Sequence, residues 1–201
     1  SRMDWKRGRG NNFHVRIEGT DPILKKETVI VEAYFDGISI VPALAPSAET
    51  ASSIAVLLEY AKYLKKNKPL RTVVLAATDA HFIGMRGISE FLDNHARKNP
   101  YYRKKLKEPF DPKLLISLDI STQSDQLGIW NNTNSYDLKR FFVPFGRRFS
   151  EYNILSANLL GRNPQRTLIN GISPIRGMDW ETFMPGGLSV NSIKALDAGI
   201  V

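Results

Sequence analysis

Four segments of the chain have the apolar pattern of β-strands. Residues 12–17 alternate between polar and apolar side chains, which predicts a strand with one exposed face. Residues 28–34, 71–77 and 114–120 are nearly continuous apolar runs, typical of strands that are buried on both faces. Residues 126–130 predict a further short strand.

Helical spacing appears between and after these strands. Apolar residues recur at intervals of three and four positions and predict one buried helix face, made of Ile54, Leu57, Leu58, Ala61 and Leu64. Pro69 ends this helix. Residues 88–96, opening at Gly87, predict a second helix, and residues 136–152 predict a third that Pro144 and Gly146 interrupt.

The order of these elements predicts an α/β fold of three layers (α/β/α), with a mostly parallel central sheet and right-handed crossovers. A length of 201 residues favours one domain, which we expect over residues 11–201. Residues 1–10 are interpreted as an N-terminal extension that begins with a cloning remnant, since Ser1 stands where an initiator Met is expected. We expect the chain to be a fragment of a longer protein.

Composition narrows the class of protein. A hydrophobic fraction of 42% and a charged fraction of 24% exclude a disordered tail, a collagen and a coiled coil. No apolar run is long enough to predict a transmembrane segment. The absence of Cys excludes disulfides, thiolate metal sites and a Cys nucleophile, and the chain has only three histidines: His14, His81 and His95.

The chain is basic, with a net charge of +8. Its densest basic run, residues 97–107, has Tyr101 and Tyr102 among the cations, as some nucleic-acid sites do. A solvated loop is the simpler interpretation of this run. Binding of nucleic acid or of an anionic surface is the alternative, and a steep salt dependence would be its signature.

Acidic residues stand at the carboxyl ends of three of the predicted strands: Asp36, Asp79 and Asp119. The carboxyl ends of parallel strands meet at one edge of a sheet, where open α/β proteins place their binding sites. We therefore expect a pocket at this edge. The alternative is that each Asp only caps the turn or helix that follows it.

Six segments, in order, resemble the zinc-dependent exopeptidases of peptidase family M28, which also include non-catalytic relatives such as transferrin receptor and nicastrin. The resemblance extends from about residue 11 to residue 190. Residues 12–21 resemble the first strand and turn, 29–37 the strand ending in His-x-Asp, 51–59 the helix after the metal-bridging Asp, 79–87 the motif Asp-Ala-Glu-Glu-x-Gly-x-x-Gly, 117–120 the strand with a late Asp ligand, and 178–190 the motif Ser-Asp-His-x-x-Phe with the Gly-Ile-Pro after it.

The resemblance implies zinc chemistry, but most of the matching positions hold other residues. The first His ligand matches Tyr34, and the bridging Asp matches Ala48 or, if the alignment shifts by one residue, Glu49. The general-base Glu matches His81 and the Glu ligand beside it matches Phe82. The last His ligand matches Trp180. The nearby Asp36 and the late ligand Asp119 are retained. The candidate pocket therefore comprises Tyr34, Asp36, Ala48, Glu49, His81, Phe82, Asp119 and Trp180.

Zinc needs three or four N, O or S donors at about 2.0–2.3 Å, and Phe, Ala and Trp offer none. The resemblance thus implies a non-catalytic member without zinc or another cofactor, which binds or scaffolds a protein or peptide partner within a larger extracytoplasmic or membrane-attached protein. The aromatic replacements either fill the space of the metal or form the walls of a pocket for a peptide or sugar, with Asp36, His81 and Asp119 as polar anchors. The alternative is a hydrolase with altered ligands, in which the same three residues form a single-metal site.

Overall fold

The computed structural model describes residues 8–38, 47–97, 108–120 and 136–163, together with short stretches at 126–129 and 166–169 and the positions 101, 106, 194, 195, 198 and 200. The contacts divide the chain into two compact units, Ser1–Ser121 with Lys194–Val201, and Thr122–Ile193. The single domain expected over residues 11–201 stays a prediction. No helix in the described ranges is long and apolar enough to cross a membrane.

The first unit is built on a four-stranded sheet with the strand order β1-β3-β2-β4. The strand β2 (Thr28–Tyr34) runs parallel to both of its neighbours, β3 (Thr72–Thr78) and β4 (Pro112–Leu118), whereas β1 (Phe13–Ile17) pairs antiparallel with β3 at the edge. The predicted α/β fold with a mostly parallel sheet is confirmed. Because β4 ends at Leu118, Asp119 follows this strand instead of lying within it.

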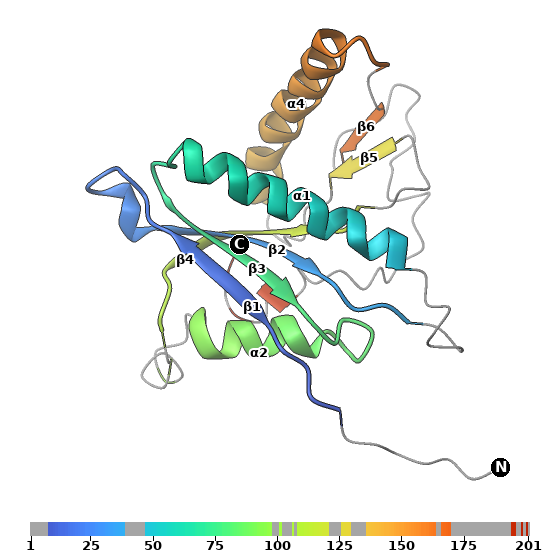
Figure 1. Ribbon diagram of the computed structural model, residues 1–201. Coiled ribbons are helices and arrows are strands. Elements are labelled where there is room, and N and C mark those ends of the chain that lie inside the picture. Colours follow the sequence, from blue (N-terminus) through green and yellow to red (C-terminus); the bar gives the residue numbers. More distant parts are fainter. Residues whose placement is uncertain are drawn as a thin grey trace, which may run out of the picture. The chain divides into compact units, whose positions relative to one another are not determined.

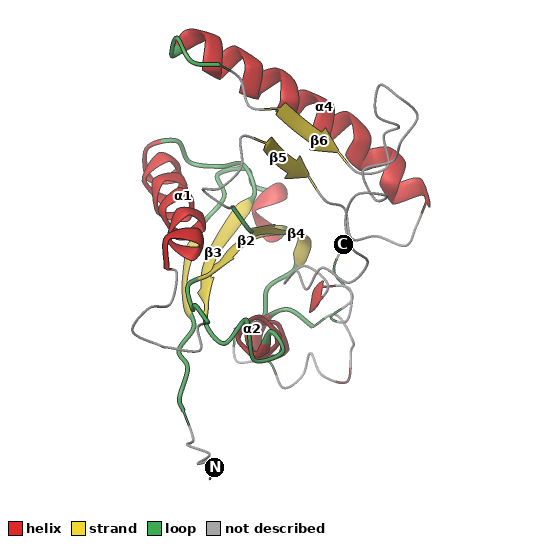
Figure 2. Cartoon of the chain, turned by 90° about the vertical axis from the view of Figure 1, so that its right-hand side faces the viewer, coloured by secondary structure: helices red, strands yellow, loops and turns green. Residues whose placement is uncertain are grey.

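Two helices cover the opposite faces of this sheet. The helix α1 (Ser47–Lys66) lies on one face and α2 (Arg86–His95) on the other, as Figure 1 and the turned view of Figure 2 both show. Alternate strand residues supply the two cores. On the α2 side, Ile30 and Val74 pack with Phe91 of the helix, and Ala195, Ala198 and Ile200 complete this cluster. The α1 side buries Val31 and Leu75 against Leu57 and Leu64.

The predicted buried face of α1 is wrong at one position, Leu58. Leu57 and Leu64 are buried and Ile54 and Ala61 pack against the same core, but Leu58 is 58% exposed. Successive residues are about 100° apart around a helix. Leu58 therefore falls beyond the margin of the face centred on its neighbours, although its spacing fits the periodicity.

The segments that lead into β2 and α2 are short. A 3-10 turn, η1 (Leu24–Lys26), precedes β2. Helix α2 begins at Arg86, one residue before the predicted Gly87. Gly87 itself is required by packing, because a Cβ at this position would overlap the carbonyl oxygen of Asp79.

The second unit holds a parallel strand pair, β5 (Gln126–Ile129) and β6 (Arg166–Ile169), and the long helix α4 (Tyr136–Leu159). The short strand was predicted, but β6 was not. The predicted interruption of the helix is wrong, since α4 continues through Pro144. A proline removes only one backbone N–H. The helix ends where Gly161 adopts a φ of 63° and the N–H of Arg162 donates to the carbonyl of Ala157 at 2.9 Å.

Candidate functional site

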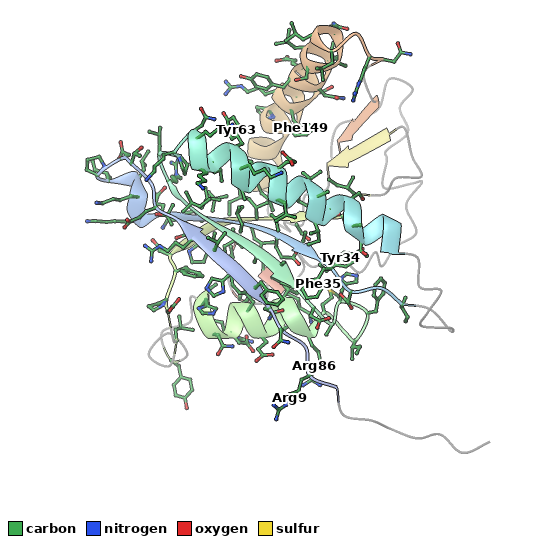
Figure 3. The ribbon with its side chains drawn as sticks, viewed as in Figure 1. Arg9, Tyr34, Phe35, Tyr63, Arg86 and Phe149 are labelled. Atoms are coloured by element: carbon green, nitrogen blue, oxygen red, sulfur yellow. The ribbon has the colours of Figure 1, made fainter. Side chains whose placement is uncertain are left out.

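The carboxyl edge of the sheet brings together the ends of three strands. Tyr34 ends β2 and pairs with Thr78, the last residue of β3, and the N–H of Phe35 donates to the carbonyl of Thr78 at 3.0 Å. Tyr34 and Phe35 are labelled at this end of β2 in Figure 3. The chain segments that follow β2, β3 and β4 therefore meet here, as the parallel order requires.

Three aromatic rings form a cluster at this edge, which we call the Tyr34 cluster: Tyr34, His81 and Phe82. The rings of Tyr34 and His81 are stacked, with centroids 3.9 Å apart and an interplanar angle of 11°. Phe82 meets both rings edge-on, at 5.8 Å from Tyr34 and 4.9 Å from His81. His81 is only 8% exposed, whereas Phe82 is 43% exposed and presents a free ring surface. Two of the three predicted aromatic replacements, Tyr34 and Phe82, thus pack on each other and on His81.

Asp119 is bound directly by a protein side chain. The Tyr34 hydroxyl donates a hydrogen bond to Asp119 Oδ1 at 2.9 Å. Burial raises the pKa of the Tyr34 phenol well above its ordinary value, and the charge and hydrogen bond of Asp119, followed by the charges of Asp36 and Glu32, raise it further. Tyr34 is therefore a neutral hydrogen-bond donor at physiological pH, not a phenolate.

Asp36 holds the loop after β3 in place. Its carboxylate accepts the backbone N–H of His81 at 3.1 Å and that of Phe82 at 3.5 Å. In the same loop Ala80 and Met85 have φ values of 55° and 57°, a left-handed conformation that is uncommon outside glycine. The N–H of Met85 donates to the carbonyl of His81 at 2.8 Å and closes the turn. Asp36 thus caps the loop that follows β3, 45 residues further along the chain, and so orients His81 and Phe82 of the Tyr34 cluster.

Asp79 has a separate role. Its carboxylate accepts the N–H groups of Ala80 at 2.7 Å and Asn11 at 3.3 Å. Asn12 in turn accepts the N–H of Asp79 at 3.1 Å and donates to the carbonyl of Gly87 at 2.8 Å. Asp79 therefore joins the segment before β1 to the loop before α2, and only two of the three predicted acidic residues contact the Tyr34 cluster.

One buried acid was missed from the sequence. Glu32 lies in the middle of β2 and is 0% exposed. Its carboxylate accepts hydrogen bonds from the hydroxyls of Thr78 at 2.5 Å and Ser117 at 2.8 Å, one on each neighbouring strand. A single charge within a continuous apolar strand was the available signal, because such a charge must find partners in the interior.

The start of α1 also reaches this edge. The N–H of Ile120 donates to the Ser53 hydroxyl at 2.8 Å, and the Ser52 hydroxyl donates to the carbonyl of Ile120. The helix thereby fixes the residue that follows Asp119. Ala48 and Glu49 belong to the first turn of α1, but their side chains lie outside the described residues, as does all of Trp180. Most of the basic run 97–107 also lies outside them.

The described side chains do not fit a zinc ion. Within the ranges given above, no group of three His, Asp or Glu side chains is placed to hold a metal. Phe82 has no donor atom, and the Tyr34 hydroxyl already donates to Asp119. What these residues can do is present an aromatic surface beside two carboxylates, a combination that suits an organic ligand.

Comparisons with known proteins agree with this fold. The family model "Peptidase family M28" matches residues 12–150. Among solved structures, a zinc aminopeptidase from Bacillus subtilis, BSAP, superposes with a TM-score of 0.52 at 16% identity, over 94% of this chain and 38% of that one. A glutaminyl cyclase from an Acidobacteriales bacterium superposes with a TM-score of 0.51 at 12% identity, over 96% of this chain and 57% of that one. LapA from Legionella pneumophila superposes with a TM-score of 0.51 at 9% identity, over 94% of this chain and 47% of that one. No curated protein sequence matches significantly. The chain spans less than two thirds of the length of each of these structures.

Proposed function

The chain belongs to peptidase family M28, and from this premise we propose that it is a non-catalytic member that serves as a binding or scaffolding module. The observation that carries the proposal is the hydrogen bond of 2.9 Å between the Tyr34 hydroxyl and Asp119. Asp119 matches a retained zinc ligand of the family, and here its carboxylate accepts a hydrogen bond from Tyr34, which stands at the position of another ligand. The Tyr34–Asp119 pair supports a site in which a protein contact has replaced the metal.

The stacking of Tyr34 on His81 supports the same proposal. A ring stack with centroids 3.9 Å apart leaves no room for an ion between the two rings. Because His81 occupies the position of the family's general base, it would also need a water molecule activated by a metal to hydrolyse an amide. In this proposal, Tyr34 at a ligand position leaves the site without a metal, and without a metal His81 has no activated water on which to act as a base.

The exposed part of the site supports a peptide as the ligand. Phe82 has an exposed ring, the Asp119 carboxylate accepts a hydrogen bond from Tyr34, and the Asp36 carboxylate accepts the backbone N–H groups of His81 and Phe82. An aromatic wall with a few polar anchors is the composition of many ligand sites. Our proposal includes a parent protein that is larger and extracytoplasmic or membrane-attached, as the resemblance implies, in which this module holds a protein or peptide partner.

A hydrolase with altered ligands is the second candidate, and the likeness to a zinc aminopeptidase favours it. Elemental analysis separates the two candidates. The purified protein is incubated with zinc, cobalt or manganese, dialysed, analysed for bound metal and assayed on aminoacyl p-nitroanilides. We expect far less than one equivalent of metal and no turnover. Stoichiometric metal that is lost in D119N, but kept in the control D93N, would establish the hydrolase instead.

Peptide binding is tested with a matched pair of variants. Phe82 is 43% exposed and Phe149, in α4, is 42% exposed. Peptides selected from a displayed library on the wild-type chain should lose affinity for F82S and keep it for F149S. Equal binding to both variants would place the ligand elsewhere.

A further inference from the structure

A cavity lies at the opposite end of the sheet from the Tyr34 cluster. It has a volume of about 460 Å³ and is lined by Arg16, Lys26, Thr28, Pro109, Phe110 and Asp111. Thr28 is the first residue of β2 and Tyr34 is the last. The length of the strand, about 20 Å, therefore separates the two places. The volume is within the range of small-molecule sites.

Of the three charged side chains in the described lining of this cavity, Arg16 and Lys26 are cations and Asp111 is an acid. Arg16 and Lys26 form no ion pair within the part of the chain that the structure describes. The one carboxylate in the described lining, that of Asp111, is paired with Lys113 at 3.1 Å. Glu27, the neighbour of Lys26, is paired with Arg71 at 2.7 Å. Two cations thus line the cavity, while Asp111 and Glu27 are paired with other cations and Glu108, next to Pro109, lies 3.9 Å from His14.

A buried hydroxyl provides an independent observation. Thr28 is only 3% exposed, and its backbone N–H donates to the carbonyl of Asp111 at 2.9 Å. Its hydroxyl has no hydrogen-bond partner in the described part of the chain. Buried polar groups without a partner are rare and costly. Arg16 pairs with Val74, and Val74 pairs with Ile30, so these side chains lie on one face of the sheet. Thr28 is two residues before Ile30 on the same strand, so its side chain lies on this face too.

We propose that this cavity binds the phosphate group of a small organic phosphate. Arg16 and Lys26 neutralise the two charges, and the Thr28 hydroxyl donates to a phosphate oxygen. The organic part of the ligand lies against Pro109 and the edge of Phe110. A dianion fits better than a monocarboxylate, because a single charge would leave one of the two cations without a partner.

Isothermal titration of the whole chain with phenyl phosphate, inorganic phosphate and benzoate tests the proposal. We expect phenyl phosphate to bind most tightly, inorganic phosphate more weakly and benzoate most weakly. The variants R16Q and K26Q should each weaken phenyl phosphate binding by about tenfold, the loss typical of one charge-assisted hydrogen bond. The control variants K65Q and K66Q, which make the same change of charge on α1, should bind like the wild type.

The variant T28V distinguishes a ligand contact from a structural role. It removes an unpartnered hydroxyl at nearly constant shape, so the fold should be as stable as the wild type or more stable. Phenyl phosphate binding should nevertheless weaken severalfold. Three results would overturn the proposal: no binding of any of the probes, equal losses in K65Q and R16Q, or full affinity in R16Q and K26Q.

Discussion

Replacing Tyr34 with Phe removes one hydroxyl and leaves a ring in the same place. The variant Y34F loses the hydrogen bond of 2.9 Å to Asp119, while a ring remains to stack on His81. A hydrogen bond to a charged group contributes about 1.5–3 kcal/mol to stability when both partners are buried. Asp119 is exposed, so water can replace the lost donor. We therefore expect the free energy of unfolding to fall by about 1 kcal/mol.

Urea denaturation at neutral pH measures this difference directly. For a chain of this size, about 1 kcal/mol corresponds to a decrease in Tm of roughly 2–4 °C. The control is Y63F, because Tyr63 is exposed on α1 and its hydroxyl makes no hydrogen bond among the described residues. That variant should change stability by less than about 0.5 kcal/mol. Equal effects in Y34F and Y63F would refute the Tyr34–Asp119 hydrogen bond.

Further predictions concern the same edge of the sheet. The pKa of Tyr34 is higher in the folded state than its unfolded-state value of 10.0. The stabilisation that results is complete below about pH 10 and is lost as the pH rises through the folded-state pKa. The wild type should therefore lose more stability than Y34F between pH 9 and about pH 12. D36A removes the acceptor of the His81 and Phe82 N–H groups and should speed their hydrogen exchange, while the control D93A should not. G87A should destabilise the chain by roughly 3 kcal/mol in thermal unfolding, because the new methyl overlaps Asp79; a neutral result would contradict the close packing. E32A leaves two hydroxyls without their acceptor and should cost about 2–4 kcal/mol in urea unfolding, whereas E32Q, which keeps an acceptor, should cost less.

The sequence predicts the fold well because the strand signals are strong. Residues 28–34 form β2 with the predicted bounds, since a run such as Val29–Val31 between two covered faces has no competing periodicity. Leu58 and the helix through Pro144 were the errors in the helices. Leu58 fits the sequence spacing but lies at the margin of the apolar face, and a helix can continue past the single N–H that a proline removes. The strand β6 has only four residues and left too short a pattern to detect.

The site was harder to predict than the fold. The resemblance to the M28 exopeptidases placed Tyr34, His81 and Phe82 at one edge, and the structure brings these three rings into contact. The stacking of Tyr34 on His81, the edge-on contacts of Phe82 and the hydrogen bond to Asp119 depend on side-chain directions that no motif encodes. Glu32 was missed because its partners, Thr78 and Ser117, come from two other strands and become neighbours only through the sheet register.

The most direct measurement is a crystal structure grown in the presence of zinc, with anomalous data collected at the zinc absorption edge. The account predicts that the Tyr34 hydroxyl lies within hydrogen-bond distance of Asp119, stacked on His81, with no anomalous peak at this edge of the sheet. An anomalous peak bonded to Asp119, with the Tyr34 ring turned away from it, would contradict the account and identify a working metal centre.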